Sequence, residues 1–273
     1  MKKSIIIILL CQIILALAGC KEKDAIPADV YEYGVFLNYE GDLFELDNYK
    51  IIVIDAQYAD AEDIRKFREK GHTVYSYINV GSLENFRDYY EKFSDITLDE
   101  YEHWEEEMWV DVSQKKWQEF ILQTLAQELI EKGIDGFFVD NCDVYYNYKT
   151  SEVFEGLVTI LKGLMETGKK VIINGGDYFL DAYCDSCEKC SDIITGINQE
   201  FVFTAIDWED NSLDVANSKD NEYYTSYLEQ YKDEGIEIFL LEYGADEYTK
   251  KKIEEYCNNN NFMFYISDSL ELN

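Results

Sequence analysis

Short apolar runs alternate with longer amphipathic stretches along most of the chain. Eight of these runs are predicted to be strands, at residues 33–38, 50–55, 73–79, 136–140, 170–174, 192–197, 237–242 and 262–267. Most are continuous in apolar residues, which is typical of strands covered on both faces, as in a parallel sheet. Their alternation with helical stretches is the βαβ pattern, and eight such strands predict an α/β fold with a single (β/α)8 TIM barrel.

Helix signals lie between several of the predicted strands. We expect helices at residues 60–70, 113–132, 151–166, 221–234 and 246–258. Gly71 and Gly133 each follow a basic residue, as capping glycines at helix C-termini do. Ser113, two residues after Asp111, is predicted to cap its helix through the hydroxyl group. Residues 81–112 are aromatic and acidic and form a long loop after the third strand, and such loops are usually functional.

The first twenty residues have the pattern of a targeting segment. Lys2 and Lys3 precede an apolar run at residues 5–16, and residues 17–20 (LAGC) close it. The run is shorter than the ~20 apolar residues of a membrane span, which favours a cleaved signal peptide over a transmembrane anchor. The closing residues resemble a bacterial lipobox, which implies acylation of Cys20 and attachment to the membrane in the cell envelope, outside the cytoplasm. We therefore expect a signal peptide (1–19), a lipid-anchored tether (20–30) and a barrel domain (31–273).

Composition narrows the range of partners. The net charge of −32 would repel nucleic acid and anionic lipid, so we expect no nucleic-acid partner. A cationic substrate would be attracted, although the charge could also serve solubility alone. Aromatic residues make up 15% of the chain, including 23 tyrosines, and suit either a sugar-binding surface or a barrel core. We expect a monomer without a cofactor.

Cysteine usage does not predict a metal site. Five cysteines remain besides Cys11 and the lipidation candidate, namely Cys142, Cys184, Cys187, Cys190 and Cys257. The spacing of the middle three is similar to part of an iron–sulfur run, but the fourth cysteine and the following proline are absent. The two histidines, His72 and His103, are too far away in sequence to suggest zinc. A loop disulfide or free thiols is the interpretation we favour, with at least one thiol unpaired.

Polar residues gather where the predicted strands end, which is where the active site of this fold lies. They are Asn38, Tyr39, Asp55, Gln57, Tyr58, Asn79, Asp140, Asn141, Asp143, Asn174, Asn198, Glu200, Glu242 and Tyr243. No histidine is among them, which argues against a Ser–His–Asp triad and against a His-ligated metal. Carboxylates without histidine suit glycoside hydrolysis, which needs an acid and a second carboxylate at one bond. They would also suit calcium, although no Asp-x-Asp-x-Asp-Gly loop occurs.

Six segments carry a resemblance to a known family. They are residues 51–58 (IIVIDAQY), 74–81 (VYSYINVG), 109–117 (WVDVSQKKW), 133–145 (GIDGFFVDNCDVY), 194–200 (ITGINQE) and 239–244 (FLLEYG). In this order they resemble glycoside hydrolase family 114, the endo-α-1,4-polygalactosaminidase type of TIM barrel, and the segment around Asp140 is the most specific. The chain departs from the family at Cys142, where a small or apolar residue is expected, and in the loop between Cys184 and Cys190.

The resemblance implies a catalytic aspartate at the end of the fourth strand and a glutamate after the sixth. We assign these as Asp140, the nucleophile, and Glu200, the acid/base, of a retaining enzyme, with Asp143 as the nearest rival. The predicted substrate-binding residues are Asp55, Gln57, Tyr58, Asn79, Trp109, Asn141, Asp143, Asn174, Glu242 and Tyr243. Asp55 and Glu242 could contact an ammonium group. Tyr58, Trp104 and Trp109 could stack on sugar rings, although Trp109 could equally be a core residue.

The implied substrate is an α-1,4-linked galactosamine-containing polysaccharide, cleaved internally. A partly deacetylated polymer carries amines, which an acidic protein would attract. Two other classes stay open from the sequence. One is a carbohydrate-binding surface lipoprotein on the same barrel without turnover, and the other is a calcium-dependent surface protein.

Overall fold

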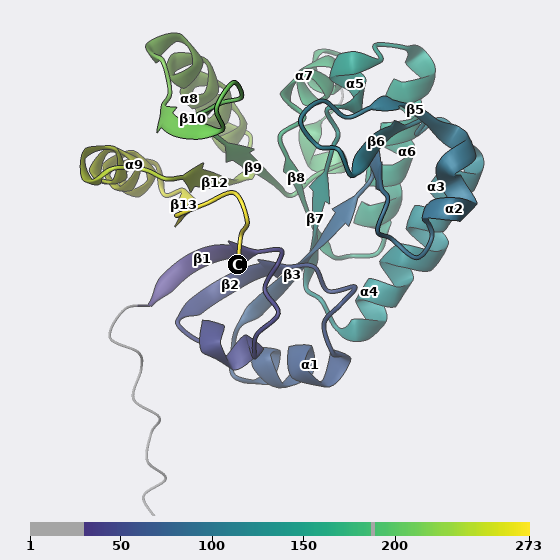
Figure 1. Ribbon diagram of the computed structural model, residues 1–273, viewed down its shortest axis with the longest axis horizontal. Coiled ribbons are helices and arrows are strands. Elements are labelled where there is room, and N and C mark those ends of the chain that lie inside the picture. Colours follow the sequence, from purple (N-terminus) through teal and green to yellow (C-terminus); the bar gives the residue numbers. More distant parts are fainter. Residues whose placement is uncertain (1–29, 187–188) are drawn as a thin grey trace, which may run out of the picture.

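Eight parallel strands form a barrel with helices around it, which confirms the predicted fold class (Figure 1). The computed structural model describes residues 30–186 and 189–273, so the signal peptide, Cys20 and Cys187 lie outside the described residues. In spatial order the barrel strands are β1 (Tyr31–Phe36), β2 (Tyr49–Ile54), β3 (Thr73–Asn79), β7 (Gly136–Asp140), β8 (Lys170–Asn174), β9 (Gly196–Glu200), β12 (Glu237–Tyr243) and β13 (Met263–Ser267). The first and last strands lie side by side. Next to them, the Asn38 backbone N–H donates to Leu272 O at 3.2 Å.

The helices begin and end largely where capping residues are found. They are α1 (Ala61–Glu69), α2 (Tyr90–Phe93), α3 (Lys115–Phe120), the π-helical η3 (Ile121–Leu125), α4 (Ala126–Lys132), α5 (Val144–Asn147), α6 (Ser151–Glu166), α7 (Asp177–Asp185), α8 (Ser218–Asp233) and α9 (Glu247–Asn260), with short 3-10 turns η1 (Leu43–Leu46), η2 (Ser94–Ile96) and η4 (Cys190–Asp192). Asp60 caps α1 by accepting from the Glu62 N–H at 2.7 Å. Gly133 ends α4 at φ 98°, as predicted.

Two apolar layers hold the barrel together. Side chains from alternate strand positions, such as Tyr33 and Val35 of β1, fill the interior, together with Tyr75, Phe138 and Phe239. The other positions pack outward against the helices. Many of the aromatic residues therefore belong to the barrel core, which is one of the two interpretations of the high aromatic content, the other being a sugar-binding surface.

Two insertions stand on the carboxyl side of the barrel strands. The predicted loop at residues 81–112 contains a three-stranded antiparallel sheet, made of β4 (Ser82–Glu84), β5 (Thr97–Glu100) and β6 (Glu107–Val110). A hairpin of β10 (Thr204–Asp207) and β11 (Ser212–Val215), which we did not predict, follows β9. The first insertion begins at Gly81, where a Cβ atom would lie 1.7 Å from the Asn141 carbonyl oxygen, so only glycine fits.

Two local predictions were wrong. The sixth strand was placed at residues 192–197, but the N–H groups of Ile193 and Ile194 both donate to Cys190 O and form a helical turn there. The strand starts at Gly196, so Glu200 is its last residue and does not lie beyond it. Ser113 does not cap the helix, because Gln114 is the N-cap residue and the Ser113 hydroxyl donates to Asp111 Oδ1 at 2.6 Å.

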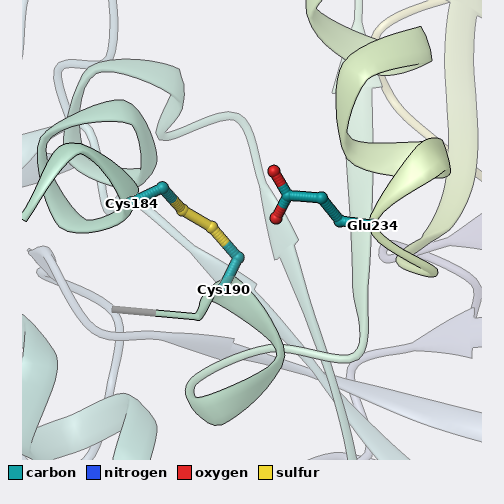
Figure 2. A group of neighbouring side chains, drawn as sticks. All are labelled: Cys184, Cys190 and Glu234. Atoms are coloured by element: carbon teal, nitrogen blue, oxygen red, sulfur yellow. A yellow bond between two sulfur atoms is a disulfide. The ribbon is translucent and has the colours of Figure 1, made fainter. Parts of the chain in front are cut away.

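Of the two alternatives for the loop cysteines, the structure has the disulfide, which joins Cys184, near the end of α7, to Cys190 in η4 (Figure 2). Cys142 and Cys257 are free and buried. Cys142 is fully enclosed in the core, so it acts as the small apolar residue that this position requires. Within the described residues, no helix is both long enough and apolar enough to span a membrane.

Candidate active site

A cleft of about 1490 Å³ opens at the carboxyl ends of the barrel strands. Its walls come from strand ends, from the insertion after β3 and from the β10–β11 hairpin. Thirteen of its lining residues are aspartate or glutamate, whereas Arg87 is its one arginine and none of the lining residues is a lysine. The predicted residues Asp55, Tyr58, Asp140, Asn141, Asp143, Asn174, Glu200 and Tyr243 all line this cleft.

Asp140 and Glu200 meet at one amide group. The Asn174 side chain donates to Asp140 Oδ1 at 3.0 Å and to Glu200 Oε1 at 2.7 Å, so these two oxygens are at most about 5.7 Å apart, the sum of the two distances. The remaining oxygens accept from phenols, Asp140 Oδ2 from Tyr77 at 3.1 Å and Glu200 Oε2 from Tyr243 at 2.8 Å. Each carboxyl group is thereby held in a fixed orientation.

The orientation of Asn174 is itself fixed from inside the barrel. Asn198 Nδ2 donates to Asn174 Oδ1 at 2.7 Å, and the Tyr33 hydroxyl donates to Asn198 Oδ1 at 3.1 Å. Because Asn174 Oδ1 accepts from Asn198, its amide nitrogen must face the carboxyl groups. Tyr33 and Asn198 are almost completely buried, so this chain of hydrogen bonds is shielded from water.

The backbone turns sharply after each strand that carries these groups. The residues that follow β7, β8, β9 and β12 all have positive φ: Asn141 (64°), Gly175 (66°), Phe201 (58°) and Gly244 (58°). Such a conformation is a strain of order 1–3 kcal/mol for a bulky residue such as Phe201 and persists only where neighbours enforce it. The strained residue Phe201 directly follows Glu200, and strain of this kind clusters at active sites.

Burial raises the pKa values of both carboxyl groups. The pKa of Glu200 is raised to about 7, by burial first and by the charge of Asp140 second, against the hydrogen bonds from Asn174 and Tyr243. Burial also raises the pKa of Asp140, which hydrogen bonds from Asn174, the Asn141 backbone and Tyr77 counteract. The pair therefore suits one protonated and one ionised carboxyl group near neutral pH.

Two further acids belong to the same region. Asp143 lies beside Gly175 and Gly176, and burial, with the charges of Asp177 and Asp140, raises its pKa to about 7. Burial raises the pKa of Glu107 to about 7 as well, although Ser82 and Asn79 donate to this carboxyl. We did not predict Glu107, because it belongs to the insertion and not to the end of a barrel strand.

Asp55 faces a cation within the protein. Arg87 donates to Asp55 Oδ2 at 2.6 Å and to Glu84 at 2.6 and 2.9 Å. The other oxygen of Asp55 accepts from the Gln57 backbone N–H at 3.1 Å. Both oxygens of Asp55 are thus occupied, which leaves little capacity for the substrate ammonium that we expected it to contact. The buried Arg87 gave no signal in the sequence, since its partners come from two separate segments.

Four predicted binding residues do not line the cleft. Trp109 is 6% exposed and packs against Tyr101 at a ring-centroid distance of 4.0 Å, so it is the core residue of the two alternatives. Glu242 is fully buried and accepts from the N–H groups of Phe203 and Thr204 and from the Thr204 hydroxyl, so its carboxyl group holds the turn after β9. Asn79 is buried and hydrogen-bonded to Ser82, and Gln57 also lies outside the lining.

Aromatic residues at the rim were only partly predicted. Tyr58 is 69% exposed in the cleft, and Trp104 is also exposed there. Tyr77, Tyr101 and Trp208 line the cleft without having been predicted. Tyr77 could have been found from its position two residues before Asn79 on the third strand, whereas the hairpin that carries Trp208 had no motif.

Among the described residues, one group has metal-ligand geometry. Cys184, Cys190 and Glu234 place their ligand atoms within 4.8 Å of one another (Figure 2). The two sulfur atoms are joined in the disulfide, so they are not available as thiolate ligands. Asp140 and Glu200 are instead held by an amide and two phenols, and we assign no metal to them.

Comparisons with known proteins find the same barrel fold in glycoside hydrolases. The glycoside hydrolase domain of PelA from Pseudomonas aeruginosa has a similar fold, with a TM-score of 0.73 and 15% identity over 88% of this chain and 95% of that one. Ega3 from Aspergillus fumigatus, in complex with galactosamine, gives a TM-score of 0.71 and 17% identity over 92% and 95%. An α-galactosidase from Thermus thermophilus gives a TM-score of 0.61 and 12% identity, over 90% of this chain and 63% of that one. No curated protein sequence matches the chain. The model of glycoside hydrolase family GH114 matches residues 22–270, and the chain therefore belongs to this family.

Proposed function

We propose that the protein is an endo-acting, retaining glycosidase that cleaves an α-1,4-linked galactosamine-containing polysaccharide. The observation that carries the proposal is the single Asn174 amide group that bridges Asp140 and Glu200. The resulting limit of about 5.7 Å between their oxygens supports retention, since retaining enzymes hold their carboxyl groups ~5–5.5 Å apart and inverting ones ~6.5–9.5 Å.

In the first step, ionised Asp140 attacks the anomeric carbon while the glycosidic C–O bond breaks and protonated Glu200 donates its proton to the leaving oxygen. In the second step, ionised Glu200 takes a proton from water, the water oxygen bonds to the anomeric carbon, and Asp140 leaves. The two inversions restore the original configuration. The raised pKa of Glu200, about 7, supports the acid role, because a general acid works best with a pKa near the working pH.

A cationic polymer suits the cleft. Its volume of about 1490 Å³ exceeds the ~300–1,000 Å³ of sites for single small ligands, which favours several sugar rings bound at once. Its acidic lining, with Arg87 already ion-paired, favours the ammonium groups of deacetylated galactosamine over the acetylated sugar.

We also propose that the protein is lipid-anchored at Cys20 and acts in the cell envelope, outside the cytoplasm. The supporting observations are the lipobox-like segment and the Cys184–Cys190 disulfide, which is typical of an oxidising compartment.

The proposal is tested by reducing-end release from partly deacetylated galactosaminogalactan. We expect release by the wild type and its loss in Asp140→Asn, at unchanged melting temperature. With an activated glycoside, Glu200→Gln should accumulate a glycosyl-enzyme that mass spectrometry detects, whereas Asp140→Asn should not. A folded wild type that binds the polymer without cleaving it would contradict the proposal and favour a carbohydrate-binding lipoprotein.

A further inference from the structure

Two insertions of the barrel contact each other through aromatic side chains in the cleft. His103 lies in the turn between β5 and β6, and Trp208 lies between β10 and β11. Their rings are stacked, with centroids 4.3 Å apart and planes at 7° to one another. Trp104 meets the same indole edge-on, at 6.4 Å and 74°. All three line the cleft that contains Asp140 and Glu200.

The backbone holds both tips in place. His103 has φ 70°, which is uncommon outside glycine, and its turn is closed by the Trp104 N–H, which donates to Tyr101 O at 3.0 Å. In the other insertion, a hydrogen bond spans Trp208: the N–H of Glu209, the residue after it, donates to Oδ1 of Asp207, the residue before it, at 2.9 Å. The backbone at Trp208 is thus held by its own hairpin, and His103 stacks on the indole before any ligand is present.

Trp104 and Trp208 are much more exposed than the two other tryptophans of the chain. Trp104 is 43% and Trp208 39% exposed, whereas Trp109 and Trp117 are 6% and 0% exposed. Exposed indoles that are held rigidly in a cleft offer apolar faces to a ligand. The C–H face of a sugar ring is such a ligand, and an ammonium group on the ring would add a cation–π attraction.

We infer that Trp104 and Trp208, with His103 as a positioning residue, form a stacking subsite for a hexosamine ring of the bound polymer. We place this subsite apart from the scissile bond, because the three residues come from the two insertions and none of them belongs to the hydrogen-bond network of Asp140 and Glu200. Tyr101 lines the same cleft, and its carbonyl oxygen closes the His103 turn. This inference rests on the proposed polysaccharide substrate.

The test is a binding titration followed by intrinsic fluorescence in the Asp140→Asn protein, which prevents turnover. The probes are long and short oligosaccharides of partly deacetylated α-1,4-galactosamine. Trp208→Ala should weaken binding of the long probe roughly tenfold and of the short one less than twofold. Trp208→Phe, which keeps an aromatic face, should restore most of the affinity, and His103→Ala should give an intermediate loss. Tyr31→Ala removes an aromatic residue of similar exposure outside the cleft and serves as the matched control.

The outcomes separate this inference from the proposed function. Tight binding of the long probe by the parent and equally tight binding by Trp208→Ala would overturn the subsite and leave the hydrolase intact. Equal losses for the long and short probes would also overturn it, because they would place Trp208 at the scissile bond. Failure of the parent to bind either probe would overturn both proposals. Loss in Trp208→Ala for the long probe alone, with rescue in Trp208→Phe, supports the subsite.

Discussion

The cleft contains two pairs of buried carboxyl groups, which differ in the side chains that donate hydrogen bonds to them. Asp140 and Glu200 face an amide and phenols, and no arginine or lysine of residues 30–186 and 189–273 donates to them. Asp55 and Glu84 face the guanidinium of Arg87, whose side chain is 2% exposed. Amide and phenol donors stabilise the ionised carboxyl group less than a buried cation does, although burial still raises the pKa of Glu84 against the hydrogen bond and charge of Arg87.

This difference suggests that the two groups of carboxyl residues have different roles, one in the reaction and the other in holding the wall of the cleft. Glu200, with a pKa raised to about 7, can change protonation state during a reaction. Asp55 and Glu84 bind Arg87 and thereby connect the end of β2 to the insertion after β3. We therefore propose Asp140 and Glu200 as the reactive pair and the Arg87 cluster as part of the wall beside them.

The largest expected effect is the loss of activity when one member of the reactive pair is replaced. Asp140→Asn should lower kcat/KM by about 10³-fold or more, because the amide cannot act as nucleophile. The matched change Asp55→Asn removes a carboxyl group from the other cluster and should lower kcat/KM less than tenfold. Steady-state kinetics on the polymer and on an activated glycoside measures both. Equal losses in the two variants would remove the distinction between the clusters.

Arg87→Met should affect stability more than chemistry. It leaves Glu84 and Asp55 without a buried cation, and loss of one partner of a buried ion pair costs about 3–5 kcal/mol of unfolding free energy. Urea unfolding measures this loss. Lys116→Met, which breaks an exposed ion pair with Asp95, should cost less than about 1 kcal/mol and is the control. A similar small loss for Arg87→Met would contradict a structural role.

The acids without a cation should make stability depend on pH. The pKa values of Glu107, Asp143, Glu200 and Glu242 are each raised to about 7, with burial as the main cause. The folded protein therefore holds protons that the unfolded chain releases near its lower ordinary pKa values, so stability is lost as pH rises toward about 7.

Unfolding free energy should thus be higher at about pH 5 than at about pH 8, by roughly 1.4 kcal/mol for each unit of net pKa difference. Glu107→Gln should reduce this difference, whereas Glu255→Gln, on the exposed face of α9, changes the same formal charge and should not. Higher stability at the alkaline end would show that the buried acids are ionised in the folded protein.

The smallest effect is expected at the disulfide. Cys184 and Cys190 close a short loop and do not line the cleft. Replacing both by alanine should lower the unfolding free energy by about 2 kcal/mol or less and leave kcat/KM within twofold. Thermal unfolding and kinetics of the double variant measure the two effects. A large loss of activity without unfolding would connect this loop to the reaction.

The sequence predicted the parts of the molecule that depend on local pattern. Continuous apolar runs identified β3, β7 and β8 with their bounds, because strands buried on both faces tolerate few polar residues. Asp140, Asn174 and Glu200 were found because parallel strands bring their carboxyl ends to one edge of a barrel.

Contacts between distant segments could not be predicted in the same way. Glu242 is a glutamate near the end of its strand, as Glu200 is, but the backbone of Phe203 and Thr204 encloses it. Trp109 belongs to a sequence motif, but its side chain packs on Tyr101. Arg87 and Trp208 depend on partners from other segments, so no local pattern distinguishes them from surface residues.

The central claim is that Asp140 and Glu200 form a retaining pair. Proton NMR of the first product formed from an α-linked galactosamine oligosaccharide tests it directly, because the anomeric configuration is read before mutarotation. We predict that the α-anomer appears first and that the β-anomer grows later. Initial appearance of the β-anomer would show inversion and would contradict the assignment of Asp140 as nucleophile.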